Sequence, residues 1–239
     1  MTRELESPYV EGAPQWDSLY RARDDEVAPT RPVFTGDVFS AVPLPGRTGK
    51  VKDRTVIVLH HPCSMRTNGV DLAWQLLTAE VTPRKEISEA DWAGGFFNLM
   101  PLPALRPGLS SQALHQAADF DALYMVQPQQ LVNRIACLSQ FGVNLLLQRW
   151  VHYSSRVIVP TYLFQEQTVA HYEEADLLEE WCDEVNSGDP QADAQACMNW
   201  LRSERDGPTY QELLANPQSH STVRKAMRAA LKNLTSPRG

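Results

Sequence analysis

The chain has 239 residues, of which 43% are hydrophobic and 21% are charged, and its formal net charge is −7. This length and composition allow a substantial core without disulfides or metals, and the negative charge argues against a protein that binds polyanions through its overall charge. No apolar run reaches the roughly 20 residues that cross a bilayer, and the first residues contain no apolar signal segment. We therefore expect a cytoplasmic protein that does not enter a membrane and keeps its four cysteines as free thiols.

The N-terminal segment, residues 1–34, combines mixed charge and four prolines with little periodicity. This predicts an arm with one short helix near Pro14. From Thr35 onward the pattern favours β-structure, since apolar residues alternate over residues 38–44. Residues 55–59 are apolar or β-branched at every position, which is typical of a central strand covered on both faces.

Three more strands are expected farther along the chain. The turn signal Asn68-Gly69 predicts a strand over residues 70–81, and further strands are expected over residues 96–102 and 121–126. Five short strands with little helix between them predict a small, strongly curved sheet or barrel. We assign this domain to residues 35–155.

The period becomes helical after Pro128. Apolar residues recur on one stripe of a long helix that would close the barrel, at Leu131, Ile135, Leu138, Leu145 and Trp150. Further helices are expected over residues 172–185, from Pro190, from Thr209 and after Pro217. Thr209 and Glu212 form a capping box at the start of the third of these helices. The predicted class is α+β, with a small, strongly curved sheet or β-barrel, a long helix and a helical C-terminal extension over residues 156–239.

Charge is distributed unevenly along this extension. Residues 157–201 contain ten acidic residues and no Lys or Arg, whereas five basic residues and no acid follow Glu212. Two interpretations stay open. In the first, both blocks are solvated helix faces. In the second, the charges have a partner: the acidic block folds against the basic tail, or the tail binds an acidic partner.

The connection between the first two predicted strands is rich in cations. It carries Arg47, Lys50, Lys52 and Arg54 against Asp53, and its glycines let a ligand approach the backbone. Such a loop can hold phosphates, so we expect RNA or DNA at Arg47, Lys50 and Lys52, joined by Arg66. The alternative is an exposed, solvated hairpin loop.

A cluster of reactive side chains, His60, His61 and Cys63, ends the predicted central strand. A thiol beside an imidazole can act as a thiolate nucleophile, with His61 as the base, whereas the alternative is a buried thiol beside a hydrogen-bonded histidine. We expect no metal site, because no second Cys/His pair completes a tetrahedral set. We also expect no cofactor, because the chain lacks a Gly-rich nucleotide loop.

Three segments carry a resemblance to a known family: Gly36-Asp37-Val38, residues 54–59 and residues 126–142. Over residues 35–150 the chain resembles the PemK/MazF family of SH3-like barrels, whose best-known members are endoribonuclease toxins. The resemblance implies that Arg54 faces a scissile phosphate and that the barrel forms a homodimer. The chain departs from the family where a hydroxyl is expected, near Pro101-Leu102-Pro103.

Three functions follow from these observations. The first is a nucleic-acid- or protein-binding module in a bacterial defence or toxin–antitoxin-like assembly, with a protein partner on the C-terminal helices. The second is a toxin-like endoribonuclease that uses Arg54, and the third is a hydrolase or transferase that uses Cys63 and His61. We prefer the first because the hydroxyl is missing and the appended helices exceed a minimal toxin, and whether the chain is an enzyme stays open at this point.

Overall fold

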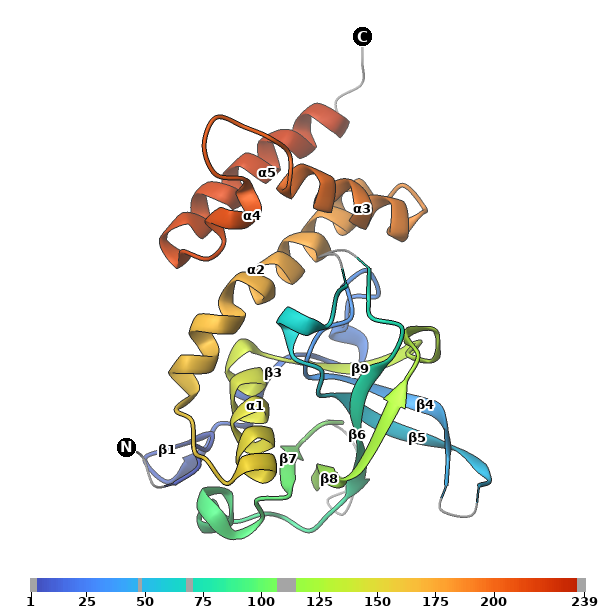
Figure 1. Ribbon diagram of the computed structural model, residues 1–239, viewed down its shortest axis with the longest axis vertical. Coiled ribbons are helices and arrows are strands. Elements are labelled where there is room, and N and C mark those ends of the chain that lie inside the picture. Colours follow the sequence, from blue (N-terminus) through green and yellow to red (C-terminus); the bar gives the residue numbers. More distant parts are fainter. Residues whose placement is uncertain (1–3, 47–48, 68–70, 107–114, 236–239) are drawn as a thin grey trace. The chain divides into compact units, whose positions relative to one another are not determined.

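A computed structural model describes residues 4–46, 49–67, 71–106 and 115–235 of the chain (Figure 1). The chain divides into two compact units: a first unit of residues 1–27 and 34–166, and a second unit of residues 28–33 and 167–239. The protein is α+β, with a seven-stranded antiparallel sheet curled into a half-barrel and followed by several helices. Within the described ranges, none of the helices combines the length and apolar character needed to cross a bilayer.

Seven strands form the sheet of the first unit in the described part of the chain, in the spatial order β3-β9-β4-β5-β6-β8-β7. Their bounds are β3 Tyr20–Arg23, β4 Asp37–Pro45, β5 Val51–Val58, β6 Leu76–Pro83, β7 Leu99–Pro103, β8 His115–Val126 and β9 Asn133–Leu138. A separate small hairpin pairs β1 (Tyr9–Val10) with β2 (Ala13–Pro14).

The five predicted strands correspond to β4, β5, β6, β7 and β8, so their existence is confirmed. The strand over residues 55–59 is central as expected, because β5 lies between β4 and β6 and its residues 56–58 are fully buried. The predicted turn at Asn68-Gly69 lies outside the described residues.

The prediction of one long helix from Leu131 is wrong. Residues 133–138 form β9, which pairs with β3 on one side and β4 on the other, and helix α1 (Gln140–Ser155) begins after it. The residues from Ile135 to Leu138 are buried at every successive position, as in a strand covered on both faces. Ser139 then caps α1, because its Oγ accepts a hydrogen bond from the backbone N–H of Gly142 at 3.1 Å.

The N-terminal segment contributes to the sheet. The short helix expected near Pro14 is a 3-10 turn over Trp16–Leu19, and it leads directly into β3, which pairs with β9. The start of α1 packs closely on this segment, since a Cβ added at Gly142 would lie 2.3 Å from the carbonyl oxygen of Leu19. Glycine at this position therefore allows the helix to approach the backbone.

Side chains of one edge strand reach the chain at the other edge. The hydroxyl of Tyr20 on β3 donates to the carbonyl oxygen of Pro103 on β7 at 2.8 Å, and Arg23 Nη1 donates to the carbonyl oxygen of Ala104 at 2.9 Å. The two edges have no ladder pairing with each other among the described residues. Side-chain hydrogen bonds therefore help to hold the sheet in its curled form.

The second unit is built from helices: most of α2 (Thr161–Val185), α3 (Pro190–Leu201), α4 (Tyr210–Leu213) and α5 (His220–Thr235). The helices expected from Pro190, from Thr209 and after Pro217 are confirmed, and Thr209 and Glu212 form the predicted capping box. The buried core of this unit includes Leu177, Leu178, Trp181, Leu201, Val223 and Met227.

A short strap, residues 28–33, belongs to this helical unit although it precedes β4 in the chain. Arg31 is only 3% exposed, and its Nη1 donates to Asp176 at 2.6 Å and to Glu179 at 2.8 Å. Thr30 Oγ1 donates to Asp183 at 2.7 Å. These bonds attach the strap to the acidic face of α2.

The acidic block and the basic C-terminal helix also pair with each other. Arg224 on α5 donates to Glu173 at 2.7 Å and to Glu180 at 2.9 Å, and Arg228 Nε donates to Glu180 at 2.8 Å. Of the two open interpretations, pairing between the blocks therefore holds for these residues. Lys225 and Lys232 remain exposed on the same helix.

Candidate functional site

The turn that follows β5 presents the reactive cluster predicted from the sequence. The backbone N–H groups of Leu59 and His60 both donate to the carbonyl oxygen of Leu77, at 2.9 and 3.2 Å, and the strand ends there. A 3-10 turn over Pro62–Ser64 follows. The structure thus brings His60, His61 and Cys63 to one end of the sheet, outside the regular ladder.

Both histidines use a ring nitrogen to accept a backbone hydrogen bond. His60 Nδ1 accepts from the N–H of Leu77 at 3.3 Å, and His61 Nδ1 accepts from the N–H of Cys63 at 3.2 Å. A ring nitrogen that accepts carries no proton, so these bonds favour the Nε2–H tautomer in both rings. The Nδ1 atom of His61 therefore accepts a hydrogen bond that shapes the turn.

The Cys63 thiol is exposed, whereas Cys137, Cys182 and Cys197 are buried. Partial desolvation raises the pKa of Cys63, so the group is a neutral thiol at neutral pH. Nucleophilic cysteines instead have a lowered pKa, because the thiolate is the reactive form. Burial therefore moves the pKa of Cys63 away from that of an activated thiolate.

An apolar pocket opens beside the two histidines. This cavity of about 330 Å³ is lined by Leu59, His60, His61, Ser64, Leu77, Leu147, Trp150, Val151 and Phe164. Trp150 is fixed in the wall by an edge contact with Phe120 at 5.5 Å and by stacking on Tyr153 at 5.8 Å, both measured between ring centres. The volume and the predominance of apolar groups around a few polar ones are typical of a ligand-binding pocket.

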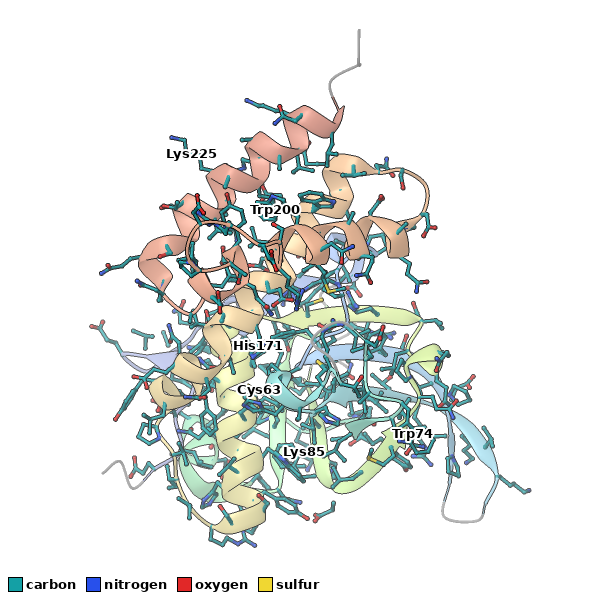
Figure 2. The ribbon with its side chains drawn as sticks, turned by 45° about the horizontal axis from the view of Figure 1, so that its top comes forward. Cys63, Trp74, Lys85, His171, Trp200 and Lys225 are labelled. Atoms are coloured by element: carbon teal, nitrogen blue, oxygen red, sulfur yellow. The ribbon has the colours of Figure 1, made fainter. Side chains whose placement is uncertain are left out.

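Apolar surface continues from this pocket onto the sheet. Met125 on β8 pairs directly with the lining residue Leu77, and its side chain is 51% exposed. Leu123, two residues earlier on β8, is 38% exposed. Trp74 in the loop before β6 is also strongly exposed, and Figure 2 shows its label well apart from that of Cys63. The pocket therefore lies in a partly apolar surface.

Arg54 occupies a different position, on the sheet itself. Its Nη1 donates to Glu80 Oε1, and its guanidinium carbon lies 5.8 Å from the centre of the Tyr124 ring. The Tyr124 hydroxyl donates to the second oxygen of Glu80 at 3.2 Å, and the bond to Glu80 raises the pKa of Arg54. The charge of Arg54 is thus matched by a carboxylate on the neighbouring strand, and none of these three residues lines the pocket.

The predicted nucleic-acid-binding residues are not gathered in one place. Lys50 and Lys52 are exposed near the start of β5, whereas Arg66 follows the other end of that strand and forms a bridge with Leu72. Arg47 lies outside the described residues. In the described ranges, no group of three or more His, Cys, Asp or Glu side chains is arranged to hold a metal ion.

The pocket walls supplied by the helices were missed at the sequence level. Leu147, Trp150 and Val151 come from α1, and Phe164 comes from the start of α2. The one available signal was Trp150 on the apolar stripe of the helix that we expected to close the barrel. Only the packing of α1 beside the end of β5 turns that stripe into the wall of an open cavity.

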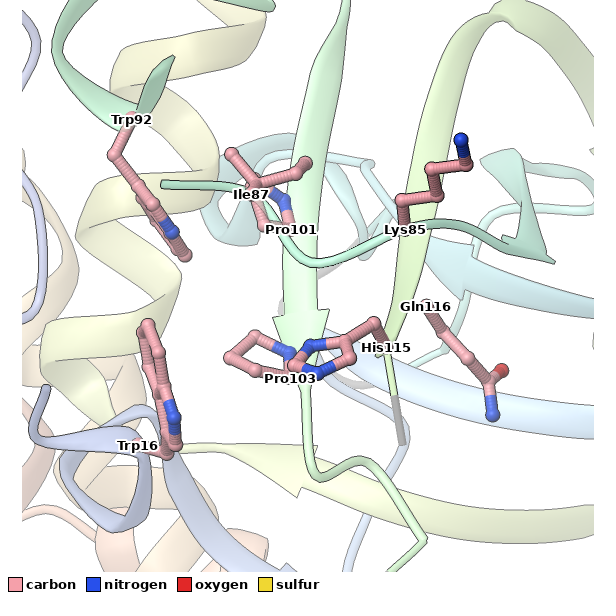
Figure 3. A pocket seen from close by; sticks show the side chains of 8 residues that line it. All are labelled: Trp16, Lys85, Ile87, Trp92, Pro101, Pro103, His115 and Gln116. Atoms are coloured by element: carbon pink, nitrogen blue, oxygen red, sulfur yellow. The ribbon is translucent and has the colours of Figure 1, made fainter. Parts of the chain in front are cut away.

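A second, narrower cavity of the first unit is shown in Figure 3. Trp16 and Trp92 stack 6.1 Å apart on one side, and Pro101 and Pro103 of β7 form another. The free volume of about 10 Å³ is close to that of one water molecule. This cavity is too small to hold an organic ligand.

Comparison of the whole chain with protein-family models gave no match, and comparison with curated proteins also gave none. The function must therefore be inferred from the geometry of the site.

Proposed function

We propose that the first unit is a non-catalytic binding module whose apolar pocket at the end of β5 receives large apolar side chains of a protein partner. The observation that carries this proposal is the contrast between the reactive groups and the pocket beside them. Arg54 is paired with Glu80, His61 Nδ1 is bonded to the backbone, and Cys63 is a neutral thiol, whereas the pocket is open.

The chemistry of the pocket favours a protein over a nucleic acid. No Lys or Arg is found among its described lining residues, so nothing there would neutralise phosphates. Large apolar and aromatic side chains are the groups that anchor protein interfaces in such pockets. The exposed Met125 and Leu123 extend the apolar area beyond the pocket and would contact the residues that flank an anchor.

We further propose that the half-barrel is a diverged SH3-like barrel of the PemK/MazF type. The curled antiparallel sheet and the hydrogen bonds that join its edges support this relationship. The segment where the family carries a hydroxyl is Pro101-Leu102-Pro103, which is buried and has none. Such a barrel would serve a bacterial defence or toxin–antitoxin-like assembly by holding another protein rather than by cutting RNA.

Peptide selection provides the test. Peptides selected from a random displayed library against the full-length protein are expected to contain Leu, Phe, Trp or Met anchors. Val151→Arg, in the pocket wall, should weaken their binding at least tenfold, measured by fluorescence anisotropy, and the exposed Met125→Glu should weaken it to a smaller extent.

Val132→Arg is the matched control, because Val132 is 81% exposed and does not line the pocket. It should leave the affinity unchanged. The proposal is wrong if no peptide is selected, or if Val151→Arg and Met125→Glu both keep the affinity of the unmodified protein while circular dichroism shows that they are folded.

A further inference from the structure

Helix α5 in the second unit has two faces of opposite character. Val223, Met227 and Leu231 are buried on one face, at spacings of four residues. Lys225, Arg228 and Lys232 are exposed on the face turned away from this stripe. Because the apolar stripe is already used in the core of the unit, the exposed face interacts through its charged and polar groups.

The exposed face of α5 forms an open depression of about 490 Å³, which we call the basic groove. Its lining residues are Ser221, Arg224, Lys225, Arg228, Ala229 and Lys232. Four of the six are cations, one carries a hydroxyl, and the last is the small Ala229, which lets a ligand come close to the helix. No Asp or Glu occurs after Glu212 in the sequence, so the helix has no acid of its own.

The neighbouring carboxylates neutralise the groove only in part. Glu173, Asp176 and Glu180 pair with Arg224, and Glu180 also accepts from Arg228, whose side chain stays 63% exposed. Lys225 and Lys232 add two exposed cations on the same face. The four lining cations outnumber the three carboxylates that pair with Arg224 and Arg228, although the whole chain carries −7.

We infer that the basic groove binds the phosphodiester backbone of a nucleic acid. Lys225 and Lys232 are seven positions apart on a helix that rises about 1.5 Å per residue, so they span roughly 10 Å, which corresponds to about three phosphates of one strand. Arg228 lies between them, and the Ser221 hydroxyl can donate to a further phosphate oxygen.

The composition of the groove favours a nucleic acid over a protein partner or a membrane surface. No aromatic or large apolar residue is found among its described lining residues, so a protein partner would find no anchor there. Membrane-surface helices insert an apolar face, whereas that face of α5 is buried. A backbone contact through charges alone also implies that the binding is independent of base sequence.

Salt-dependent binding measures the number of phosphates involved. The full-length protein should bind a fluorescein-labelled 20-base-pair duplex, and the logarithm of the affinity should fall with the logarithm of salt concentration with a slope of about −3, as three neutralised phosphates predict. The double variant Lys225→Gln/Lys232→Gln should reduce the size of this slope by about 2 and weaken binding at least tenfold at low salt. DNA and RNA duplexes of the same sequence distinguish the two sources of phosphate.

The matched control is Lys50→Gln/Lys52→Gln, which removes the same charge from exposed positions of the first unit and should bind as the unmodified protein does. The inference is overturned if neither duplex binds, if the α5 variant keeps the affinity and slope, or if the control variant loses them instead. It is also overturned if polyglutamate of equal charge competes as well as the duplex, since an acidic protein would then be the partner. None of these outcomes depends on the peptide pocket of the first unit.

Discussion

The hydroxyl of Tyr20 donates a hydrogen bond of 2.8 Å to the carbonyl oxygen of Pro103, a residue 83 positions farther along the chain. The bond is buried and joins the two edge strands of the sheet, and burial raises the pKa of Tyr20, so the donor stays protonated. Edge strands expose unpaired backbone groups that invite association with other chains. Here one such group is occupied by a side chain from the opposite edge.

Removing this hydroxyl should weaken the sheet. Tyr20→Phe leaves the buried Pro103 carbonyl without its donor, and we expect the free energy of unfolding to fall by about 1–3 kcal/mol, the usual cost of an unsatisfied buried acceptor. Urea unfolding followed by circular dichroism measures the change. Tyr162→Phe, at a residue that is 61% exposed, should have no effect, and equal stabilities for both variants would contradict the role given to Tyr20.

The strap should stabilise the helical unit through Arg31. Arg31→Met removes the buried cation that Asp176 and Glu179 share, and leaves both partly buried carboxylates without this bond. We expect a loss of about 2 kcal/mol or more, with the midpoint of thermal unfolding lowered accordingly. Lys50→Met, at an exposed position, supplies the comparison. An unchanged midpoint for Arg31→Met would show that the strap adds nothing to stability.

Thiol labelling should distinguish Cys63 from the other cysteines. In the native protein one thiol should react with iodoacetamide, because only Cys63 is exposed, and Cys63→Ser should abolish the reaction. Since partial desolvation raises the pKa of Cys63, the rate should be below that of free cysteine at pH 7 and should reach its half-maximal value at a higher pH. A rate above that of free cysteine at pH 7 would instead favour the hydrolase or transferase alternative.

RNA should stay intact in the presence of excess protein. Arg54 is the residue whose charge the toxin-like mechanism would direct at a phosphate. Here its guanidinium forms a salt bridge with the carboxylate of Glu80. Gel electrophoresis of a labelled single-stranded RNA after prolonged incubation tests this expectation. Cleavage by the unmodified protein that disappears in Arg54→Ala would support the endoribonuclease alternative and contradict a purely binding role.

The sequence predicted those elements whose local signals agree with their tertiary setting. Residues 55–59 were assigned to a central strand because their apolar run fits burial on both faces, and α4 was predicted because its capping box acts within a single turn. Strand β9 was missed because Leu131, Ile135 and Leu138 are spaced as on a helix, and only pairing with β3 and β4 reveals the strand.

The candidate site was predicted only in part, for a similar reason. The cluster at His60, His61 and Cys63 follows from the end of one strand, which is a local property. The pairing of Arg54 with Glu80 instead depends on the register of β5 against β6, in which Glu80 lies opposite Val56. The pocket depends on helices that follow almost a hundred residues later, so a linear pattern could not reveal it.

The strap at residues 28–33 has a consequence for any attempt to divide the protein. The helical unit takes residues 28–33 from the connection between β3 and β4, and the rest of it comes from residues after 166. A truncation at that point would separate Arg31 from Asp176 and Glu179. An isolated C-terminal fragment would therefore lack the buried cation that these two carboxylates share. Supplying residues 28–33 as a separate peptide should therefore rescue the solubility of such a fragment, in the manner of fragment complementation.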